Sequence, residues 1–430
     1  MAEYYPKGYK IPLANGSYAE IIQKLGEGGQ GVVYRVAIGG KEYALKWYHK
    51  GAVQNPKKFY QNLENNVNKG APTKAFLWPL YLTQPVDGSF GYIMELRPKN
   101  YREFSDFLLA KAHFQSLSSA VNAALNITNG FRELHRNGFS YQDLNDGNFF
   151  IDAENGDVLI CDNDNVAPYG ESLGIAGKAR YMAPEVVRNL KRPDVMTDRF
   201  SLAVVLFRLL FLDHPLEGKR VVEAPCLTEE LELKYYGKDP IFIYDPTDDS
   251  NRPVRGVHSN AIKFWPLYPQ FIQNKFITAL SKDAMTGKTT RMTDNDWQLA
   301  FTRLRDTIIT CPCGSETFIN VAGDASCINC GRRIPKPPVL NCHNHKYGLA
   351  LFPGVKMYRC HIDKDSDDFT RVIGEVERNP KNPAMWGLRN VSDIVWNAET
   401  LDGTLKPIVP ITAIKAIHFP NSIGIIEYSK

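Results

Sequence analysis

The stretch Tyr141-Gln142-Asp143-Leu144-Asn145-Asp146-Gly147-Asn148 decides the fold, because two further motifs follow it at short distances. These motifs are Ile160-Cys161-Asp162-Asn163-Asp164 and Tyr181-Met182-Ala183-Pro184-Glu185. All three lie between Arg102 and Arg305, where the hydrophobic residues recur at helical spacing. Upstream the period shortens to that of strands, so a β lobe precedes a helical lobe. This order predicts an α+β arrangement with a cleft between the lobes.

The first part of the chain, roughly Tyr18 to Met94, alternates β-branched and aromatic runs with glycine turns and predicts a small antiparallel sheet. Its glycine-rich loop consists of Gly26, Gly28 and Gly31, followed by Val33. Without side chains, the backbone amides of such a loop can approach phosphate oxygens. The same spacing also occurs in dinucleotide-binding folds and in ordinary hairpins. Because this loop leads into a strand and not into a helix, a dinucleotide-binding fold is disfavoured.

The strand after the glycine loop carries Lys46 in Tyr43-Ala44-Leu45-Lys46, where an ammonium group can hold phosphates. A helical acid has to fix this ammonium group, and Glu64 is the only candidate before the next predicted strand. A single lysine on a strand is usually a solvated surface residue. Its position directly after the glycine loop favours phosphate binding instead.

With its motifs in this order, the chain resembles the eukaryotic-type protein kinase family over roughly residues 18 to 305. The resemblance implies a two-lobed kinase fold in residues 1–305, with an N-lobe of about 1–94 and a C-lobe of about 98–305. It also implies transfer of the γ-phosphoryl group of ATP to a protein hydroxyl. We expect Ser or Thr as the acceptor, because these are the commoner acceptors in the family.

The resemblance assigns catalytic roles to individual residues. Asp143 matches the carboxylate that orients the attacking hydroxyl and accepts its proton. Asn148, five positions later, and Asp162 match the ligands of Mg²⁺, or of Mn²⁺ in its place. Lys46, fixed by Glu64, is expected to hold the α- and β-phosphates.

The same resemblance predicts the surroundings of the nucleotide. Adenine is expected between Val33 and Ala44 above and Phe150 below, with its edge on the hinge that follows Met94. The residues expected to bind the nucleotide are Gly26, Gly28, Gly31, Val33, Ala44, Lys46, Met94, Glu95, Arg97 and Phe150.

The kinase motifs also predict two structural contacts, and this chain departs from one of these motifs. Glu185 is expected to pair with Arg291, and Asp198 is expected to cap the backbone of the catalytic loop. The family's His-Arg-Asp is Tyr141-Gln142-Asp143 here, so the arginine that reads a phosphorylated activation loop is missing. Activity is therefore not expected to depend on phosphorylation of that loop.

Three further departures concern charge. The Phe-Gly that usually follows the metal-binding aspartate is Asn163-Asp164, which adds a carboxylate near the metal site and predicts a tighter or additional cation. The catalytic-loop lysine is replaced by Asn145, and the threonine of the following segment is replaced by Lys178. Because these two positions meet in the family, we expect Lys178 to replace the missing charge.

The departures keep a second interpretation open, a pseudokinase scaffold that binds nucleotide and a partner without phosphoryl transfer. Catalysis is favoured because decay of function would be expected to remove some of the essential residues. All of them are retained: Lys46, Glu64, Asp143, Asn148 and Asp162.

Paired cysteines follow in residues 306–338, which we interpret as a zinc ribbon and a linker. The pairs are Cys311, Cys313 and Cys327, Cys330, each followed by a glycine. Four thiolates without an open position indicate structural Zn²⁺, and four free thiols are the alternative. A second group follows no ligand spacing and is interpreted as ordinary core and surface residues: Cys342, His343, His345, Cys360 and His361.

The remaining residues, 339–430, predict a small all-β module with a faint resemblance to a degenerate forkhead-associated sandwich. The motifs with which that family binds phosphopeptides are absent, so a docking role is expected. The whole architecture is similar to bacterial kinases of tellurite-resistance systems. These work with a von Willebrand factor A protein of the TerY type and a PP2C-like phosphatase, which implies a partner protein as substrate.

Composition limits the remaining possibilities. A chain of 430 residues is too long for one core, so several domains are expected. The net charge of +4 and the absence of a basic run with aromatic residues argue against nucleic acid as a partner. We expect no secretory signal and no membrane span, because the longest apolar run, 201–212, is too short. The cysteine pattern fits a reducing cytoplasm.

Overall fold

The computed structural model describes residues 5–171, 173, 177–320, 323–363, 366, 368–406 and 411–428. The chain divides into two compact units, which are described separately. The first unit comprises Met1–Phe114, Asn126–Ile262 and Phe276–Asn295, and the second comprises Gln115–Leu125, Lys263–Lys275 and Asp296–Lys430.

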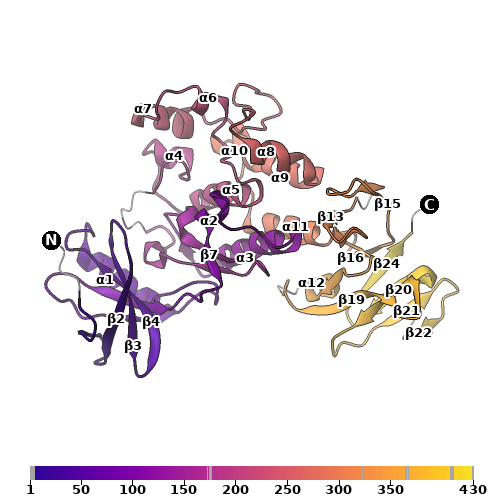
Figure 1. Ribbon diagram of the computed structural model, residues 1–430, viewed down its shortest axis with the longest axis horizontal. Helices are drawn as coiled ribbons and strands as arrows, with labels where there is room; N and C mark the ends of the chain where they lie inside the picture. Colours follow the sequence, from indigo (N-terminus) through magenta and orange to yellow (C-terminus); the bar gives the residue numbers. More distant parts are fainter. Residues whose placement is uncertain are drawn as a thin grey trace. The chain divides into compact units, whose positions relative to one another are not determined.

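The first unit begins with the expected antiparallel sheet, which has six strands in the order β1-β2-β3-β4-β6-β5. Figure 1 shows β2, β3 and β4 side by side in indigo and purple. The buried face is formed by β-branched and aliphatic residues, such as Val36, Leu45 and Ile93, that follow the two-residue period of strands. The strands are β1 (Lys10–Pro12), β2 (Tyr18–Glu27), β3 (Gly31–Ile38), β4 (Lys41–Tyr48), β5 (Tyr81–Leu82) and β6 (Gly91–Glu95).

Helix α1 follows β4 and packs Phe59 and Leu63 into the hydrophobic cluster that also holds Tyr92 and Met94 of β6. Its first turn is capped by the side chain of Asn55, which accepts from the N–H of Lys58 at 3.1 Å. The helices are α1 (Pro56–Lys69), α2 (Phe104–Leu108), α3 (Leu117–Arg136), α4 (Pro184–Val187), α5 (Val195–Phe211), α6 (Lys219–Val222), α7 (Glu229–Glu232), α8 (Ser259–Phe264), α9 (Gln270–Ala279), α10 (Lys282–Met285), α11 (Asp294–Arg305) and α12 (Arg359–Ile362).

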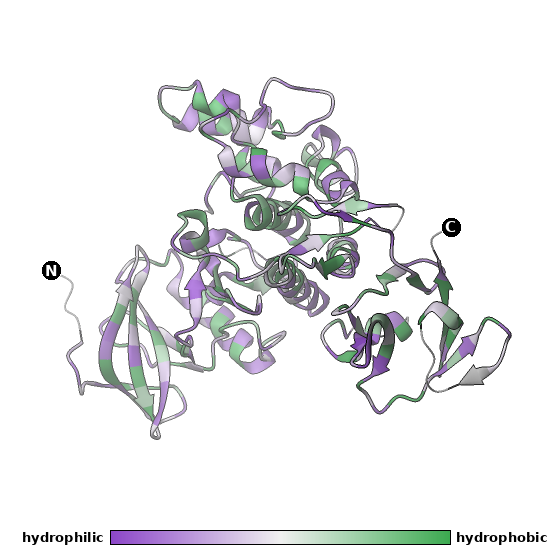
Figure 2. Cartoon of the chain, turned by 45° about the vertical axis from the view of Figure 1, so that its right-hand side comes forward, coloured by the Kyte–Doolittle hydropathy of each residue, from purple (hydrophilic) through white to green (hydrophobic). Residues whose placement is uncertain are grey.

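Helix α5 is the buried centre of the helical part, as its apolar sequence predicts. Asp194 caps its first turn, because its carboxylate accepts from the N–H of Thr197 at 3.0 Å. Figure 2 shows the inner helices largely in green, whereas the strands near the N-terminus carry both green and purple stretches. Within the residues that the structure describes, no helix is both long and apolar enough to cross a membrane.

A short hairpin positions the central loops of the first unit. In it, β9 (Phe149–Asp152) pairs with β10 (Val158–Ile160), and Phe149 lies opposite Ile160. This register brings the residue before β9 and the residues after β10 together, and the N–H of Cys161 donates to the carbonyl oxygen of Asn148 at 2.8 Å. Neighbouring elements are β7 (Tyr101–Glu103), β8 (Phe139–Ser140), β11 (Ala167–Pro168), and the one-turn helices η1 (Asp146–Asn148), η2 (Asn163–Asn165), η3 (Leu233–Lys238) and η4 (Trp265–Leu267).

The second unit contains two small hairpins and two larger antiparallel sheets. The hairpins are β12 (Ile308–Thr310) with β13 (Glu316–Phe318), and β14 (Ala325–Ser326) with β15 (Arg333–Ile334). The six-stranded sheet, in spatial order, is β17 (Tyr347–Ala350), β16 (Val339–Cys342), β24 (Ser422–Glu427), β23 (Ile414–Phe419), β21 (Asn397–Thr400) and β22 (Leu405–Lys406). The three-stranded sheet is β18 (Lys356–Tyr358), β19 (Val372–Asn379) and β20 (Asn382–Asn390), and η5 spans Ile411–Ala413.

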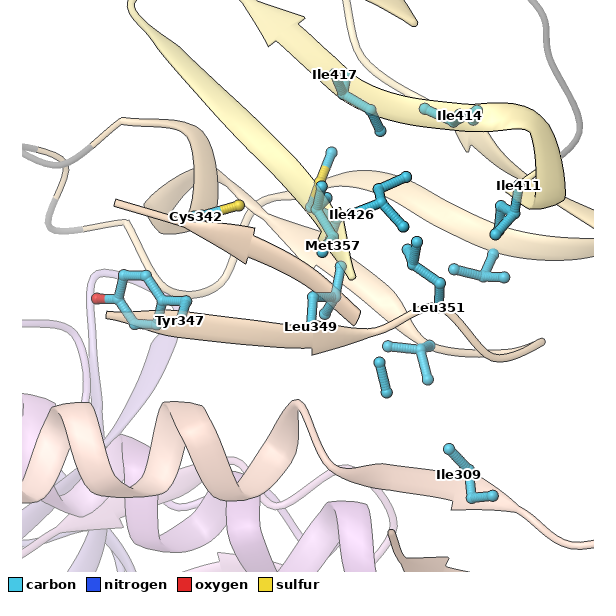
Figure 3. Close-up of a cluster of buried hydrophobic side chains, with 14 of the residues drawn as sticks. Ile309, Cys342, Tyr347, Leu349, Leu351, Met357, Ile411, Ile414, Ile417 and Ile426 are labelled. Carbon is cyan, nitrogen blue, oxygen red and sulfur yellow. The ribbon is translucent and has the colours of Figure 1, made fainter. Parts of the chain in front are cut away.

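One hydrophobic cluster serves the sheets and the hairpins of the second unit. Figure 3 shows Leu349, Met357 and Ile426 gathered between the strands that carry them. The same cluster includes Cys311 and Cys327, which lie in the turns of the hairpins. The cysteine-bearing turns therefore pack against the β strands that follow them. The mainly β character expected for residues 339–430 is present.

Candidate functional site

Lys46 on β4 is the centre of a cluster of charged side chains in the first unit. Its Nζ lies 2.8 Å from Oδ2 of Asp164 and 3.0 Å from Oδ1 of Asp162. It also lies 3.3 Å from Oε1 of Gln30 in the glycine loop. Burial alone would lower the pKa of Lys46, but Asp164 and Asp162 outweigh it and raise this pKa above its usual value. Lys46 is therefore a buried ammonium group.

The predicted ion pair between Lys46 and Glu64 is wrong for this structure. Glu64 is exposed, and its carboxylate accepts from Nε2 of Gln61 at 2.9 Å. The reason is the rotational phase of α1, which turns Asn62 and Asn66 inward together with its apolar residues. Both amides donate to the carbonyl oxygen of Val166, at 2.8 and 3.0 Å, so the inward polar side chains of α1 bind backbone and not Lys46.

Asp164 takes the place that was predicted for Glu64, and it was expected beside the metal instead. Its side chain is fully buried and accepts from the hydroxyl of Tyr48 at 2.6 Å and from that of Tyr92 at 3.3 Å. The sequence contained a signal for both tyrosines. Tyr48 is two residues after Lys46 on the same strand face, and Tyr92 lies opposite Lys46 in the register of β4 and β6.

The catalytic-loop backbone is capped by Asp198 of α5, as expected. Its carboxylate accepts from the N–H of Tyr141 at 2.6 Å and from that of Gln142 at 3.2 Å. On its other side, Asp198 lies 3.2 Å from Nε2 of His135, whose Nδ1 lies 3.0 Å from Asp294. Burial would lower the pKa of His135, but the two aspartates outweigh it and raise this pKa to about 9. His135 was missed by the sequence analysis.

Asp143 lies in this loop beside the two residues that depart from the family pattern. Nδ2 of Asn145 donates to Oδ1 of Asp143 at 3.3 Å, and Nζ of Lys178 donates to Oδ1 of Asn145 at 3.0 Å. Burial raises the pKa of Asp143 to about 6, against the lowering effects of Asn145 and Lys178. Asn145 and Lys178 thus meet beside Asp143, which is the arrangement that the sequence predicted.

Asn148 and Asp162 flank the β9–β10 hairpin at its open end: Asn148 directly precedes β9, and Asp162 follows β10 by two residues. Asp162 has a left-handed backbone, with φ of 55°, and its side chain is 41% exposed. Oδ1 of Asn148 accepts from the N–H of Asn145 at 2.7 Å. An amide oxygen has a second lone pair, so Asn148 can still bind a cation. An exposed carboxylate and an amide oxygen are ligands that suit Mg²⁺.

The residues expected around adenine share one hydrophobic cluster. Ala44 and Met94 are buried in it, and Val33 and Phe150 pack against it. The guanidinium group of Arg97 lies over the ring of Phe150, 4.1 Å from its centroid. The side chain of Glu95 points to the surface, where it accepts from Nζ of Lys41 at 3.0 Å.

The glycines of the loop play different roles. A Cβ at Gly31 would lie 2.1 Å from the carbonyl oxygen of Trp47, so Gly31 is required by the close pairing of β3 and β4. At Gly26 and Gly28, a Cβ would meet no atom within 4 Å. The space beside these two glycines is therefore open to a ligand that approaches their backbone.

Polar contacts are also made by Glu171, Leu173 and Glu185, which are among the described residues after Asp162. The side chain of Gln142 donates to the carbonyl oxygen of Glu171 at 2.7 Å and accepts from the N–H of Leu173 at 3.3 Å. Glu185 forms the expected pair with Arg291 through two hydrogen bonds of 2.8 Å. A neutral amide thus contacts the backbone of Glu171 and Leu173 from the position where the family pattern has arginine.

In the second unit, the four predicted cysteines meet. Their sulfur atoms all lie within 4.8 Å of one another, and the pairs Cys311 with Cys330 and Cys313 with Cys327 are 3.8 Å apart. A tetrahedral site with Zn–S bonds of about 2.3 Å has sulfur–sulfur edges of about 3.8 Å. The spacing fits a metal site and is far longer than a disulfide of about 2.05 Å.

His361, one of the second group of cysteines and histidines, has protein partners. Its Nε2 lies 2.8 Å from Oδ2 of Asp306, and its Nδ1 accepts from the N–H of Tyr358 at 2.9 Å. Both His361 and Asp306 are buried. The two ring nitrogens are thus engaged in the core of the second unit.

Comparison with known proteins shows what the chain is similar to. A family model described as protein kinase domain matches residues 19–263. The chain is 29% identical over 231 residues to G protein-coupled receptor kinase 2 of Caenorhabditis elegans, covering 50% of the chain and 31% of that protein. It is 26% identical over 219 residues to ribosomal protein S6 kinase alpha-4 of Homo sapiens, with shares of 48% and 28%.

A third relative is dual specificity protein kinase shkB of Dictyostelium discoideum, which is 28% identical over 246 residues. That match covers 54% of the chain and 33% of the relative. In each case the match spans no more than a third of the relative's own length.

Proposed function

The chain belongs to the protein kinase family, whose domain model covers more than half of it, and we propose that it is an active enzyme. It transfers the γ-phosphoryl group of ATP to a Ser or Thr hydroxyl of a partner protein. One observation carries this proposal: Nζ of Lys46 lies 3.0 Å from Oδ1 of Asp162, although the two residues are 116 positions apart. A group suited to phosphate and a group suited to a divalent cation therefore share one site.

Asp143 orients the acceptor hydroxyl and takes its proton as the oxygen attacks phosphorus. The backbone just before it, at Tyr141 and Gln142, is fixed by the cap from Asp198, and its carboxylate accepts from Asn145. A pKa of about 6 makes it a stronger base than an ordinary aspartate while leaving it ionised at neutral pH. These properties support a role as general base.

Lys46 and Lys178 supply positive charge at two places. Lys46 holds the α- and β-phosphates, and the amides of the loop around Gly26 and Gly28 cover the phosphates from above. Lys178 stabilises the charge that develops on the transferred group, in place of a lysine at position 145. Its hydrogen bond to Asn145 supports this exchange of positions.

Mg²⁺ or Mn²⁺, when bound with ATP, neutralises charge on the β- and γ-phosphates. Asp162 and Asn148 are the residues that hold the cation. The adenine ring contacts Val33, Ala44 and Phe150, with its edge toward the hinge at Glu95 and Arg97. The shared cluster of Val33, Ala44, Met94 and Phe150 supports this position.

The activation segment is proposed to be held without phosphorylation. A phosphorylated loop needs an arginine partner, but Gln142 instead contacts the backbone at Glu171 and Leu173. These hydrogen bonds need no charge on the loop, so they form in the enzyme as synthesised.

The acceptor and the partner are proposed from resemblance. The relatives include a dual specificity protein kinase, so tyrosine is tested beside serine and threonine. The architecture resembles kinases that act with a TerY-type von Willebrand factor A protein and a PP2C-like phosphatase. We propose a protein of the former type as the first substrate to test, with the β module of residues 339–430 as a docking element.

The four-cysteine cluster is proposed to be a structural zinc ribbon. Its four sulfur ligands leave no open position, and its sulfur–sulfur distances suit a tetrahedral ion. The ion would tie together the two hairpins, whose turns also belong to the hydrophobic cluster of the second unit. Such thiolate sites fit a reducing compartment such as the cytoplasm.

The test of the function is transfer of labelled phosphate from ATP by the full chain, with Mg²⁺ and the candidate substrate. Asp143→Ala and Asp162→Ala should each lower transfer by roughly 10²-fold or more, and Asp249→Ala, an exposed acid outside the site, should not change it. Phosphoamino acid analysis identifies the acceptor. Equal labelling in all variants, or ATP binding without transfer, would support the scaffold alternative.

A further inference from the structure

The carboxylate of Asp164 is surrounded by three donors from the first sheet. Nζ of Lys46 and the hydroxyl of Tyr48 donate to Oδ2, at 2.8 and 2.6 Å, and the hydroxyl of Tyr92 donates to Oδ1 at 3.3 Å. The carboxylate is fully buried. A buried carboxylate is strongly destabilising unless it is paired and hydrogen-bonded, and here both oxygens have partners.

The geometry of the sheet explains why the donors converge. Lys46 and Tyr48 point to the same face of β4, and Tyr92 is directly opposite Lys46 on β6. From the other side, the turn η2 presents Asp164 to this face. Its first residue, Asn163, is anchored by two hydrogen bonds of 2.9 Å from Nδ2 to the carbonyl oxygens of Leu77 and Ile160.

We propose that Asp164 is the positioning residue that holds Lys46 in place for the phosphates of ATP, in the role predicted for a glutamate on α1. The inference rests on the proposed function only in that Lys46 binds phosphate. It does not require that phosphate is transferred.

The two carboxylates beside Lys46 differ in their exposure to solvent. Lys46 contacts two carboxylates, of which Asp164 is fully buried, whereas the side chain of Asp162 is 41% exposed. The buried Asp164 is thus the carboxylate enclosed with the ammonium group, whereas the more exposed Asp162 can also face a divalent cation. Asp164 was expected to add a carboxylate to the metal site, but its side chain is fully buried and its contacts are with Lys46 and two tyrosines.

Helix α1 is left without a direct role in fixing Lys46. Its inward polar residues, Asn62 and Asn66, bind the carbonyl oxygen of Val166, and Glu64 faces solvent. In kinases whose lysine pairs with a glutamate on this helix, helix position controls activity. Here the charged partners of Lys46 come from the loop after β10. Helix α1 contacts that loop through the carbonyl oxygen of Val166 and the sheet through Phe59, which packs on Tyr48.

The test is a binding experiment on the full chain by calorimetry, with ATP and with adenosine, which lacks phosphates. Asp164→Asn keeps the size of the side chain and removes its charge. It should weaken ATP binding roughly 10-fold or more, as expected for a lost charge-assisted hydrogen bond, and change adenosine binding less than about twofold. Glu64→Gln is the matched control and should leave both affinities unchanged.

Tyr92→Phe serves as the second variant, because it removes one donor to Asp164 and leaves every charge in place. Loss of adenosine binding in Asp164→Asn would show that this variant is misfolded. Tyr92→Phe then tests the proposal, and it should lower the affinity for ATP roughly threefold. In an active enzyme, Asp164→Asn should also raise KM for ATP and lower kcat.

The outcomes separate the inference from the proposed function. Unchanged ATP affinity in a folded Asp164→Asn variant overturns the inference, whether or not the wild-type chain transfers phosphate. A loss of ATP affinity in Glu64→Gln equal to that in Asp164→Asn overturns it as well. The third outcome concerns the proposed function alone. It is overturned if the affinity for ATP depends on Asp164 but the wild-type protein transfers no phosphate.

Discussion

Lys178 donates a hydrogen bond from Nζ to Oδ1 of Asn145 at 3.0 Å, so the two residues that exchange character relative to the family pattern touch each other. Lys178→Met should lower kcat by roughly 10²-fold, because a charge-stabilising contact to the transferred group is lost. Steady-state assays at saturating ATP measure this effect. Lys219→Met, which removes an exposed lysine paired with Glu223, is the control. Near-normal turnover in Lys178→Met would contradict the exchange.

The rate of phosphoryl transfer should depend on pH through Asp143. Burial raises the pKa of this carboxyl to about 6, and only its ionised form accepts a proton. Activity should therefore fall about tenfold per pH unit below pH 6 and level off above it. Because Lys178 lowers this pKa, the midpoint in Lys178→Met should move to higher pH. A midpoint near pH 4 in the wild-type enzyme would exclude the assignment.

Folding stability should fall as pH rises from 6.5 through 9. His135 has a pKa of about 9 when it is held between Asp198 and Asp294, and about 6.5 in the unfolded chain. The folded state therefore binds more protons in this range, so its stabilisation is complete below pH 6.5 and is lost above pH 9. The difference is on the order of 3 kcal/mol.

Urea unfolding at several pH values measures the contribution of His135. The unfolding free energy of His135→Gln is subtracted from that of the wild type at each pH, so that contributions of titrating groups common to both proteins cancel. This difference should shrink as pH rises. If it stays constant from pH 6 to 10, then His135 is not a protonated partner of the two aspartates.

The cysteine cluster should contain one zinc ion in each chain, as measured by metal analysis of purified protein. Cys330→Ser should reduce the zinc content and lower Tm, because a structural thiolate site contributes directly to folding. Cys226→Ser changes an exposed cysteine outside the cluster and should have no effect. Wild-type protein that is fully folded after chelation, with no bound metal, would favour four free thiols.

The hydrogen bonds of Gln142 predict that phosphatase treatment leaves activity unchanged. Gln142→Ala should lower activity several-fold, because the backbone of Glu171 and Leu173 loses both partners. Gln142→Arg provides the contrast, since it restores a residue able to bind phosphate. An enzyme that loses its activity on dephosphorylation would show that the amide does not replace the charged contact.

The sequence predicted those contacts that depend on the order of motifs. Glu185 with Arg291, the cap from Asp198, and the meeting of Asn145 with Lys178 all follow from motif positions, and all three are present. The four cysteines also converge as their Gly-flanked pairs suggest. Whether these residues perform the assigned chemistry stays a prediction.

The partner of Lys46 was not predicted correctly, for a physical reason. The acid was chosen by its position along the chain, but the phase of α1 decides which side chains turn inward. Phe59 and Leu63 are four residues apart and define the buried face, and Glu64 is one position, about 100°, away from Leu63. Asp164 is 118 residues from Lys46, and no local pattern indicates such a contact.

The glycines of the loop differ in the space around them, so a substitution that disturbs folding can be distinguished from one that affects only ligand binding. A side chain at Gly31 would collide with the backbone of the neighbouring strand, whereas Gly26 and Gly28 have room for one. A valine at position 28 should therefore leave the sheet intact and, where the loop covers phosphates as proposed, weaken the binding of ATP. Such a variant would separate the proposed nucleotide-dependent activity from any binding of a partner by residues 306–430.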